Sequence, residues 1–506
     1  MASPQDIANR VPITVALMLA TLMNTLDSTI ANVALPHIQG SVSAAQDEIV
    51  WVLTSYIVAT AIMTPLSGWL ALKIGRKQMF VWSVAGFTVA SMLCGMATNL
   101  PEIVIFRLLQ GIAGASLMPL SQTTLLDIWP SGRLQRVMAV WSAAVVMGPI
   151  VGPVLGGYLT ESLSWRWVFY INLPVGILAL FFIITFMSGS HVGGERPFDF
   201  LGFAGLALFI GGFQLVVDRG PGRDWFDSAE VWTEALLSGG GLYVFIVQSM
   251  TTRHPFFAGA LLRDRNFIAT VMFNMVTGIL LFATSAMLPS FMQNLLGYSA
   301  LQSGVASMTR GVGAFLSFIF IPFLVSRVGA RPVLLLGLCL SASALWQMSR
   351  FDLSMTAGPI MVAGLVQGLG MGCLFSPLQV LAYATLPPQL RGEGAVVSTI
   401  ARSLGSSAGI SMIQALVIHK TEVAHTVLAA HITVTDPVVK WALPSFMSLT
   451  SPTGLRLLDL EVTRQAAMIA YDVVFSGMAV ATILAAPVLL ILRSPKGPVE
   501  LEVLPD

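Results

Sequence analysis

The sequence predicts an all-α integral membrane protein, and its composition carries that prediction. Of 506 residues, 55% are hydrophobic and only 10% are charged, whereas a soluble globular domain has about 25% charged residues. Most of the surface therefore cannot face water, which excludes a soluble enzyme. The 26 Lys and Arg nearly balance the 25 Asp and Glu, so no excess charge is available to hold nucleic acid.

Apolar stretches long enough to cross a bilayer, about 20 residues of helix, recur along the whole chain. We count fourteen, at residues 13–35, 49–71, 78–97, 101–125, 136–159, 167–187, 201–217, 231–250, 267–292, 302–325, 333–348, 357–381, 395–418 and 468–492. The first is longer than the apolar region of a secretory signal, and no small-residue cleavage site follows it. We expect it to be an uncleaved span.

The distribution of basic residues orients these spans, because Lys and Arg of short loops stay on the cytoplasmic side. With an inner N-terminus, the short outer loops carry only Arg166, Arg219, Arg223 and Arg350. The inner segments carry far more, including Lys73, Arg76, Lys77, Arg133, Arg136, Arg263, Arg265, Arg327 and Arg331. An even number of spans with both termini cytoplasmic follows.

Two pairs of similar sequence segments indicate an internal repeat. Gln110-Gly111 in the fourth stretch and Gln367-Gly368 in the twelfth stand 257 residues apart, about half the chain. The basic turn at residues 73–77 resembles the turn at 327–331. Duplicated halves are typical of secondary transporters, which rock one bundle against the other. The alternative is that glycine-rich membrane helices look alike by chance.

Four motifs lie in order along the first five stretches. They are Leu26-Asp27-Ser28-Thr29-Ile30-Ala31-Asn32-Val33-Ala34-Leu35-Pro36, Gly68-Trp69-Leu70-Ala71-Leu72-Lys73-Ile74-Gly75-Arg76-Lys77, Arg107-Leu108-Leu109-Gln110-Gly111 and Gly148-Pro149-Ile150-Val151-Gly152-Pro153-Val154-Leu155-Gly156-Gly157. Together they resemble the major facilitator superfamily, specifically its fourteen-helix drug:proton antiporter family, of the type that works with a periplasmic adaptor. The resemblance spans nearly the whole chain.

The resemblance implies two pseudo-symmetric six-helix bundles plus two extra helices. We expect the N-terminal bundle at 1–190, the two additional helices at 191–265, and the C-terminal bundle at 266–506 with a long outer loop at 419–467. It also implies proton-coupled efflux of amphipathic drugs or other toxic compounds across the cytoplasmic (inner) membrane by alternating access. A periplasmic membrane-fusion adaptor and an outer-membrane channel are the implied partners.

Ionisable groups inside a membrane are costly, so each is a functional candidate. Asp27 and Arg107 lie at compatible depths, and our hypothesis is that Asp27 alternately holds a proton and faces Arg107 or a cationic substrate. The alternative is a permanent pair that locks two helices. In the C-terminal half, Asp472 and Arg310 are the parallel candidates, for proton coupling or for a structural bridge.

Other residues are candidates for the substrate cavity and for gating. Polar contacts and adaptable walls for a cavity would come from Asn24, Gln110, Asn274, Met23 and Met118. Gating or hinge residues would be Gly148, Pro149, Gly152, Pro153, Gly156, Gly157, Gly68, Gly75 and Arg76. Ordinary packing is the alternative for the methionines and glycines, and cytoplasmic anchoring for the basic turn. Leu72 stands where the family usually has an acid, which puts the family's charge latch in doubt.

The energy source and the long outer segment complete the sequence-based picture. We expect no cofactor, because the chain has no phosphate-binding P-loop and no cluster of metal ligands; the proton gradient would drive transport. The segment at 419–467 would dock the adaptor, or would form a simple amphipathic lid or linker. A dedicated exporter or importer of one metabolite is the rival function, and a polytopic membrane enzyme a remote one.

Overall fold

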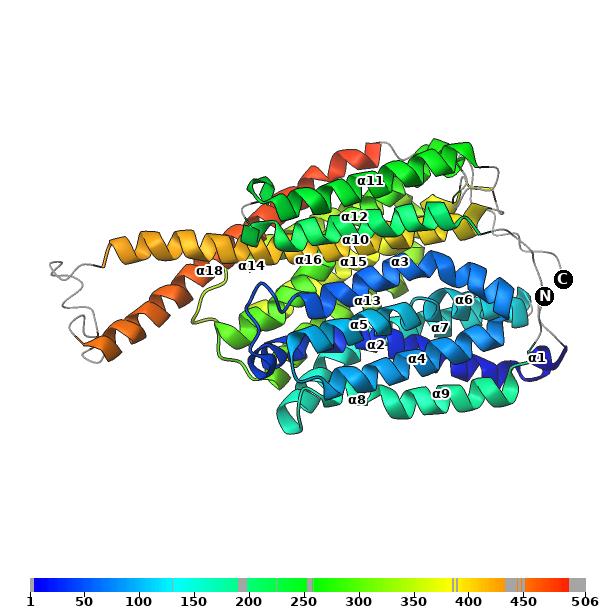
Figure 1. Ribbon diagram of the computed structural model, residues 1–506, viewed down its shortest axis with the longest axis horizontal. Coiled ribbons are helices and arrows are strands. Elements are labelled where there is room, and N and C mark those ends of the chain that lie inside the picture. The colour runs from blue at the N-terminus through cyan, green and yellow to red at the C-terminus, as the bar shows by residue number, and fades with distance from the viewer. Residues whose placement is uncertain are drawn as a thin grey trace.

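Helices are the only regular secondary structure in the part of the chain that the structure describes. The computed structural model describes residues 4–129, 131–189, 198–223, 225–252, 257, 259–384, 386–387, 390–432, 444, 447 and 451–490. Within these residues there is no strand. Figure 1 shows the long helices running side by side along the long axis of the molecule. The predicted all-α fold class is confirmed.

The N-terminal half contains nine helices in its described part. They are α1 (Pro4–Ala8), α2 (Arg10–Val42), α3 (Trp51–Ile74), α4 (Arg76–Met96), α5 (Leu100–Gly114), α6 (Leu117–Ile128), α7 (Ser131–Ser162), α8 (Trp167–Tyr170) and α9 (Asn172–Phe186). The apolar stretch at 101–125 is thus split, because the chain turns after Gly114 before α6 begins. Asn99 caps α5 by accepting a hydrogen bond from the backbone of Glu102.

The remaining helices of the described chain follow from residue 200 onward. They are α10 (Phe200–Arg219), α11 (Ala229–Thr251), α12 (Arg265–Asn294), α13 (Ala300–Val328), α14 (Ala330–Met348), α15 (Ala357–Ala384), α16 (Arg391–Ala430) and α18 (Pro452–Leu484), with short 3-10 turns at Pro221–Arg223, Trp225–Asp227, Leu261–Arg263 and Ala486–Leu490. Asp199, Asp264 and Ser299 cap α10, α12 and α13 through their side chains.

The two halves repeat the same packing scheme. In the first, α3 and α4 both pack on α5 and α2 packs on α7; in the second, α13 and α14 both pack on α15 and α12 packs on α16. The turns between α3 and α4 and between α13 and α14 also match: Gly75 has φ +91° and Gly329 has φ +85°, a backbone region that favours glycine. The predicted internal repeat is thus visible in three dimensions.

Ten helices in the described part of the chain are long and apolar enough to cross a membrane. Four further helices, α3, α7, α11 and α16, lie beside them and contain between 23 and 40 residues. Exposed side chains on the outer helices are largely apolar, among them Leu236, Tyr243, Phe320 and Leu484, as expected of a surface that faces lipid. The count of fourteen spans stays a prediction.

The two additional helices form a hairpin that lies against both halves. Glycines let α10 and α11 approach closely, since a Cβ at Gly205 or Gly241 would meet backbone of the partner helix within 3 Å. On its other side α10 packs on α3 of the N-terminal half and on α16 of the C-terminal half. Val58, Ile210 and Ile400, one from each helix, share a buried apolar cluster. The hairpin therefore covers the α3–α16 seam between the halves.

Much of the long outer loop predicted at 419–467 is helical. Helix α16 runs on to Ala430 and α18 begins at Pro452, so residues 419–430 and 452–467 extend two spans by about 18 Å and 24 Å at about 1.5 Å per residue. Figure 1 shows the two helices projecting beyond the bundle, at the end opposite α1. We call residues 419–430 and 452–467 the extension.

Candidate functional site

A buried ion pair lies inside the N-terminal bundle. Asp27 on α2 is 0% exposed and Arg107 on α5 is 1% exposed, and Arg107 Nη1 donates to Asp27 Oδ2 over 2.6 Å. The predicted meeting of these two residues is therefore found. Burying two charges is costly unless the remaining hydrogen-bonding positions are also satisfied, and the surroundings of the pair meet that condition.

Two amides complete the coordination of the carboxylate. Gln110 Nε2 donates to Asp27 Oδ1 over 2.8 Å, and Asn172 Nδ2 donates to the same oxygen over 3.0 Å. Asn172 also donates to the hydroxyl of Ser91 on α4, which in turn donates to the carbonyl of Phe169. Asp27 thus accepts hydrogen bonds from α5 and α9 as well as its ion pair.

Arg107 is held from three directions. Its Nε donates to the carbonyl of Val52 on α3 over 2.9 Å, and its Nη1 also donates to Gln110 Oε1 over 2.8 Å. The guanidinium lies over the ring of Tyr56, with its carbon 4.4 Å from the ring centre, an arrangement that stabilises a cation in a desolvated site. Five helices, α2, α3, α4, α5 and α9, therefore meet at this network.

The Asp27 network is closed to water in this arrangement. While Arg107, Gln110 and Asn172 all donate to Asp27, its carboxylate is neutralised and fully shielded. A shift of α5 against α2 would separate the cation from the carboxylate and leave a buried charge without its partner. The site lies within the N-terminal bundle rather than on the surface between the halves, so such a shift is also needed for water to reach it.

The parallel candidates in the C-terminal half are not brought together. Arg310 on α13 donates from Nη1 to the hydroxyl of Ser285 on α12. Asp472 lies on α18, which packs on α14 and α16, and its Oδ1 is buried and accepts no hydrogen bond from the described residues. No ion pair joins the two side chains, so the structural bridge considered for them is not formed.

The structure places the residues predicted for a substrate cavity in different surroundings. Gln110 belongs to the Asp27 network, and Met23 is buried in an apolar cluster of the N-terminal bundle. Asn24 donates to Tyr56 Oη and to the carbonyl of Gly114, where the chain turns between α5 and α6. Asn274 on α12 is 1% exposed, and neither its Oδ1 nor its Nδ2 has a hydrogen-bond partner in the described chain. Met118 is half-buried on α6.

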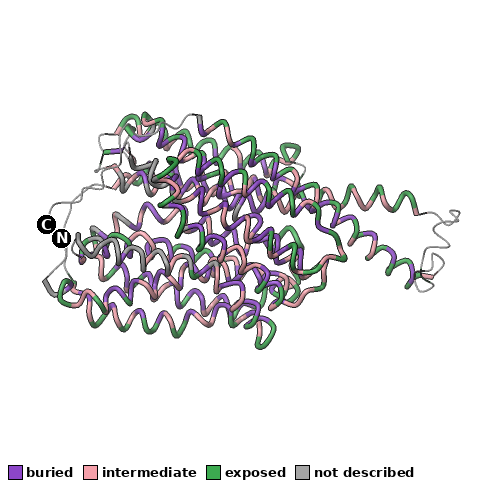
Figure 2. The backbone as a smooth tube through the Cα atoms, turned by 180° about the vertical axis from the view of Figure 1, so that it is seen from behind, coloured by how far each residue is buried: buried purple, intermediate pink, exposed green. Residues whose placement is uncertain are grey.

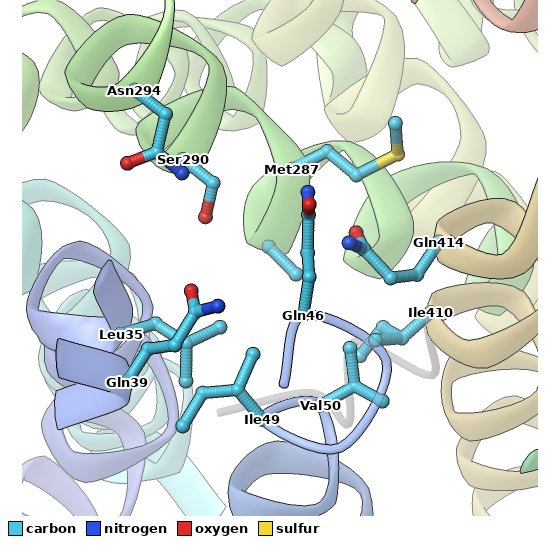
Figure 3. Close-up of a pocket in the computed structure, with 11 residues that line it drawn as sticks. Leu35, Gln39, Gln46, Ile49, Val50, Met287, Ser290, Asn294, Ile410 and Gln414 are labelled. Atoms are coloured by element: carbon cyan, nitrogen blue, oxygen red, sulfur yellow. The ribbon is translucent and has the colours of Figure 1, made fainter. Parts of the chain in front are cut away.

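A small void lies instead between the halves, at the end where α2 stops and α3 starts, which the charge pattern places outside. It has room for about one water molecule. Figure 3 shows uncharged polar side chains around it, with apolar residues between them. The polar lining is Gln39, Gln46, Ser290, Asn294 and Gln414. Nearby, Gln293 Nε2 donates to the carbonyl of Val33 over 2.9 Å, which fastens α12 to α2.

The glycine-rich motif of α7 packs against both halves. A Cβ at Gly148 or Gly156 would come within 2.7 Å of backbone atoms of Thr25 or Ile30 on α2, and Gly152 faces Thr29. A Cβ at Gly157 would lie 2.8 Å from the Cα of Leu301 on α13. The carbonyl of Pro153 faces Gly304 on α13. The side chain of Pro149 lies outside the described residues.

The basic turn ties helix ends together. Arg76 pairs with Asp127 at the end of α6, and Lys77 donates over 2.8 Å to the carbonyl of Ile184 in the last turn of α9. Lys73 lies over the ring of Trp69. The side chain of Leu72 and the surroundings of Gly68 lie outside the described residues, so the family's latch at this position stays untested.

Sequence reasoning missed two polar residues that the structure places in buried clusters. Asn172 completes the Asp27 network, and the signal for it was an amide inside an otherwise apolar stretch. Asp218 lies in the last turn of α10, one residue beyond the predicted span at 201–217, and Thr54 Oγ1 on α3 faces its Oδ2 at 3.5 Å. Its other oxygen, Oδ1, is buried and accepts no hydrogen bond from the residues described.

Comparisons with known proteins agree with this arrangement. The model of the Major Facilitator Superfamily matches residues 17–410. The chain is 31% identical over 476 residues to the multidrug export protein EmrB of Escherichia coli, covering 93% of each chain. It is 30% identical over 490 residues to the fatty acid resistance protein FarB of Neisseria gonorrhoeae, covering 96% of each.

Solved structures show the same fold at lower identity. A bacterial homologue of the human lysosomal transporter Spinster, in an inward-facing conformation, superposes with a TM-score of 0.63 at 16% identity over 98% of this chain and all of that one. The nucleoside transporter NupG superposes with a TM-score of 0.62 at 12% identity, over 95% of this chain.

Proposed function

Because this chain belongs to the major facilitator superfamily, and is thus a multi-pass transporter of the inner membrane rather than an enzyme, we propose that it exports amphipathic toxic compounds in exchange for protons. The names of its relatives point to drugs in one case and to fatty acids in another. Both are classes of amphipathic compounds. The observation that carries the proposal is the buried Asp27–Arg107 pair with its two amide donors.

Asp27 is the proposed proton carrier. In the conformation described, Arg107 balances the charge of the Asp27 carboxylate, so the carboxylate does not have to be solvated by water. When α5 moves relative to α2, the carboxylate loses its cation and takes a proton from the outer aqueous phase; the return movement brings Arg107 back and expels the proton inward. One proton moving down about 100 mV releases about 2.3 kcal/mol, enough for about a 50-fold substrate gradient.

Alternating access would use the two seams between the halves. On one side, glycines of α7 and α13 pack on each other's backbone, which allows sliding without large side chains in the way. On the other side, α3 and α16 meet beneath α10. The polar lining of the outer void consists of neutral amides and a hydroxyl, whose hydrogen bonds are individually weak and can break and reform as that end opens.

We further propose that the extension hands substrate to a periplasmic adaptor. Its two helices stand clear of the bundle on the predicted outer side and touch through His425 and Asp459, 3.0 Å apart. Exposed apolar side chains lie along both helices: Val423, Val427, Leu455, Leu457 and Leu460. Apolar groups exposed beyond the membrane are typical of surfaces that bind another protein.

Transport assays on an Asp27→Asn variant test the proposal. We expect cells lacking the wild-type gene to become sensitive to some members of a panel of dyes, uncouplers, fatty acids and antibiotics. Wild type should restore resistance, and a protonophore should abolish that protection. Asp27→Asn keeps the size of the side chain and its acceptor oxygen, so it should reach the membrane in normal amounts and yet restore no resistance.

Asp352→Asn is the matched control. This acid lies in the loop between α14 and α15, where the hydroxyl and backbone of Ser354 donate to it and lower the pKa of its carboxyl. It should leave resistance unchanged. Wild-type resistance from Asp27→Asn, or protection that survives the protonophore, would contradict the proposal.

A further inference from the structure

A second buried carboxylate lies where the hairpin of α10 and α11 joins both halves. Asp218 on α10 faces Thr54 of the N-terminal half at 3.5 Å. One turn earlier on α10, Gln214 donates over 3.2 Å to Ser411 of the C-terminal half, and the Ser411 hydroxyl and the Gln214 amide also face the Asp218 carboxyl. The cluster of Asp218, Gln214, Thr54 and Ser411, which we call the seam cluster, therefore spans three parts of the molecule.

No cation is paired with Asp218 in the described chain. The neighbouring Arg219 pairs with Glu230 and Glu234 of α11 and acts on Asp218 only through its charge, as the last and smallest of the influences on that carboxyl. Arg223 pairs with Glu230. The other charged groups of the packed elements are distant or acidic: Lys73 at the far end of α3, Arg402 and His419 more than two helical turns from Ser411 on α16, and Asp47 beside Gly222.

This setting suits an uncharged carboxyl better than a carboxylate. Neutral hydroxyls and an amide replace water poorly around a full charge, and a buried ion without a partner costs several kcal/mol. When α3 separates from α16, water reaches the same group and the charge becomes inexpensive. Opening and closing of the seam and the charge on Asp218 are therefore linked.

The seam cluster is also linked to the Asp27 network through α3. Arg107 donates to the carbonyl of Val52, and Thr54 follows two residues later, about 3 Å along the same helix. A displacement of the first turn of α3 would change the surroundings of both carboxylates. Ser411 lies between Ile410 and Gln414, which line the outer void, so the cluster is also close to the predicted outer entrance.

We infer that Asp218 is a second proton-binding carboxylate of this transporter, which takes a proton from outer water as the outward-open α3–α16 seam closes and keeps it while the seam is closed beneath α10. The O–H bond forms with a proton from outer water and breaks when the seam opens on the inner side, where the proton passes to inner water, so no other reactant is needed. This inference rests on the proposed proton-coupled export and adds a site on the extra hairpin.

Transport by the full chain in liposomes tests the inference, with ethidium as the probe and a fatty acid as the second probe. Asp218→Asn is permanently uncharged and cannot release a proton. We expect the substrate gradient driven by an imposed pH difference to fall by up to about 50-fold, the share of one proton at about 100 mV. Exchange of labelled for unlabelled probe across the membrane, which needs no net proton movement, should persist.

Glu234→Gln is the matched control, since it removes another buried acid of the same hairpin that faces Arg219 instead of the seam. Its gradient should equal that of wild type. Thr54→Val should shift the pH dependence of transport, and Thr54→Ser should restore it. An unchanged gradient in Asp218→Asn overturns the inference, and so does equal loss of gradient and exchange, which would indicate a purely structural role.

Infrared spectroscopy separates this inference from the proposed function, because it needs no substrate. The reconstituted wild type should show a carboxyl band that changes with pH and disappears in Asp218→Asn but not in Glu234→Gln. If wild type fails to couple export to protons, the proposed function is wrong. The carboxyl band then tests by itself whether Asp218 binds a proton. Absence of any band change in Asp218→Asn overturns the assignment.

Discussion

Gln367 donates over 3.2 Å to the hydroxyl of Thr284, and this pair is the C-terminal counterpart of Gln110 and Asp27. Both bonds join residues 83 apart, and each partner is displaced by 257 residues between the halves. At the position equivalent to Arg107 stands Gly364. The charged residues at positions 27 and 107 are thus replaced by neutral ones at the equivalent positions of the repeat.

The first prediction concerns this asymmetry. Gln110→Leu removes a hydrogen bond to a carboxylate, worth about 1.5 to 3 kcal/mol, and should lower both stability and proton-driven transport. Gln367→Leu removes one hydrogen bond between uncharged groups, together with an Oε1 that is buried without a partner in the described chain. It should change stability and transport only slightly. Thermal unfolding of the purified variants and transport in liposomes measure the difference; equal effects of the two changes would refute it.

The second prediction concerns the buried ion pair. Arg107→Gln leaves Asp27 buried without a cation and should destabilise the protein by about 3 to 5 kcal/mol. Adding Asp27→Asn removes that charge, so the double variant should be more stable than Arg107→Gln alone although it transports nothing. Unfolding in detergent compares the two. If the double variant is no more stable than Arg107→Gln, the loss of stability does not come from leaving the charge of Asp27 unpaired.

The third prediction concerns the glycine seam. Gly304→Ala places a methyl group against the backbone of Pro153 and Val154, and Gly157→Ala does so against Leu301. Either change should push α7 and α13 apart and slow transport. Gly477→Ala on α18 is the control, since a Cβ there meets nothing within 4 Å. Initial transport rates in liposomes measure the effect, and unchanged rates in both seam variants would speak against close sliding contact.

The fourth prediction concerns the extension. Val427→Lys and Leu460→Lys replace apolar side chains that are 54% and 66% exposed. Resistance of intact cells should fall, because docking of the adaptor loses apolar contact, whereas transport in liposomes without adaptor should stay unchanged. Thr426→Lys adds the same charge at an exposed polar position and serves as the control. Full resistance in both apolar variants would rule out this surface.

The N-terminal site was largely predictable from sequence. A buried acid and a buried arginine at matching depth have few partners other than each other, so Asp27 and Arg107 could be paired in advance. Asn172 could not be placed, because periodicity does not say which faces of α2 and α9 meet. Pairing Arg310 with Asp472 by depth alone did not succeed, since depth does not tell which helices are neighbours.

The helical form of the extension and the place of Asp218 could not be predicted, because the ends of apolar runs do not mark the ends of helices. A span ends in sequence where apolar residues give way to polar ones, but a helix ends only where its backbone is interrupted. Between Gly409 and Pro437 there is neither glycine nor proline, so α16 continues beyond the membrane to Ala430. Ser451 then caps α18, with Pro452 in its first turn. Asp218 lay outside the predicted span for the same reason, since the apolar run ends at residue 217 and the helix continues to Arg219.

The position of α10 has a consequence for the speed of the cycle. Helix α10 contacts both halves, so it can move with only one of them when they separate. Each turnover must therefore break its contacts with the other half. Since Thr54 and Ser411 attach it through hydroxyl groups and not through an ion pair, the step costs far less than separating two opposite charges in lipid. The hairpin of α10 and α11 can therefore shield the seam from lipid without slowing the conformational change.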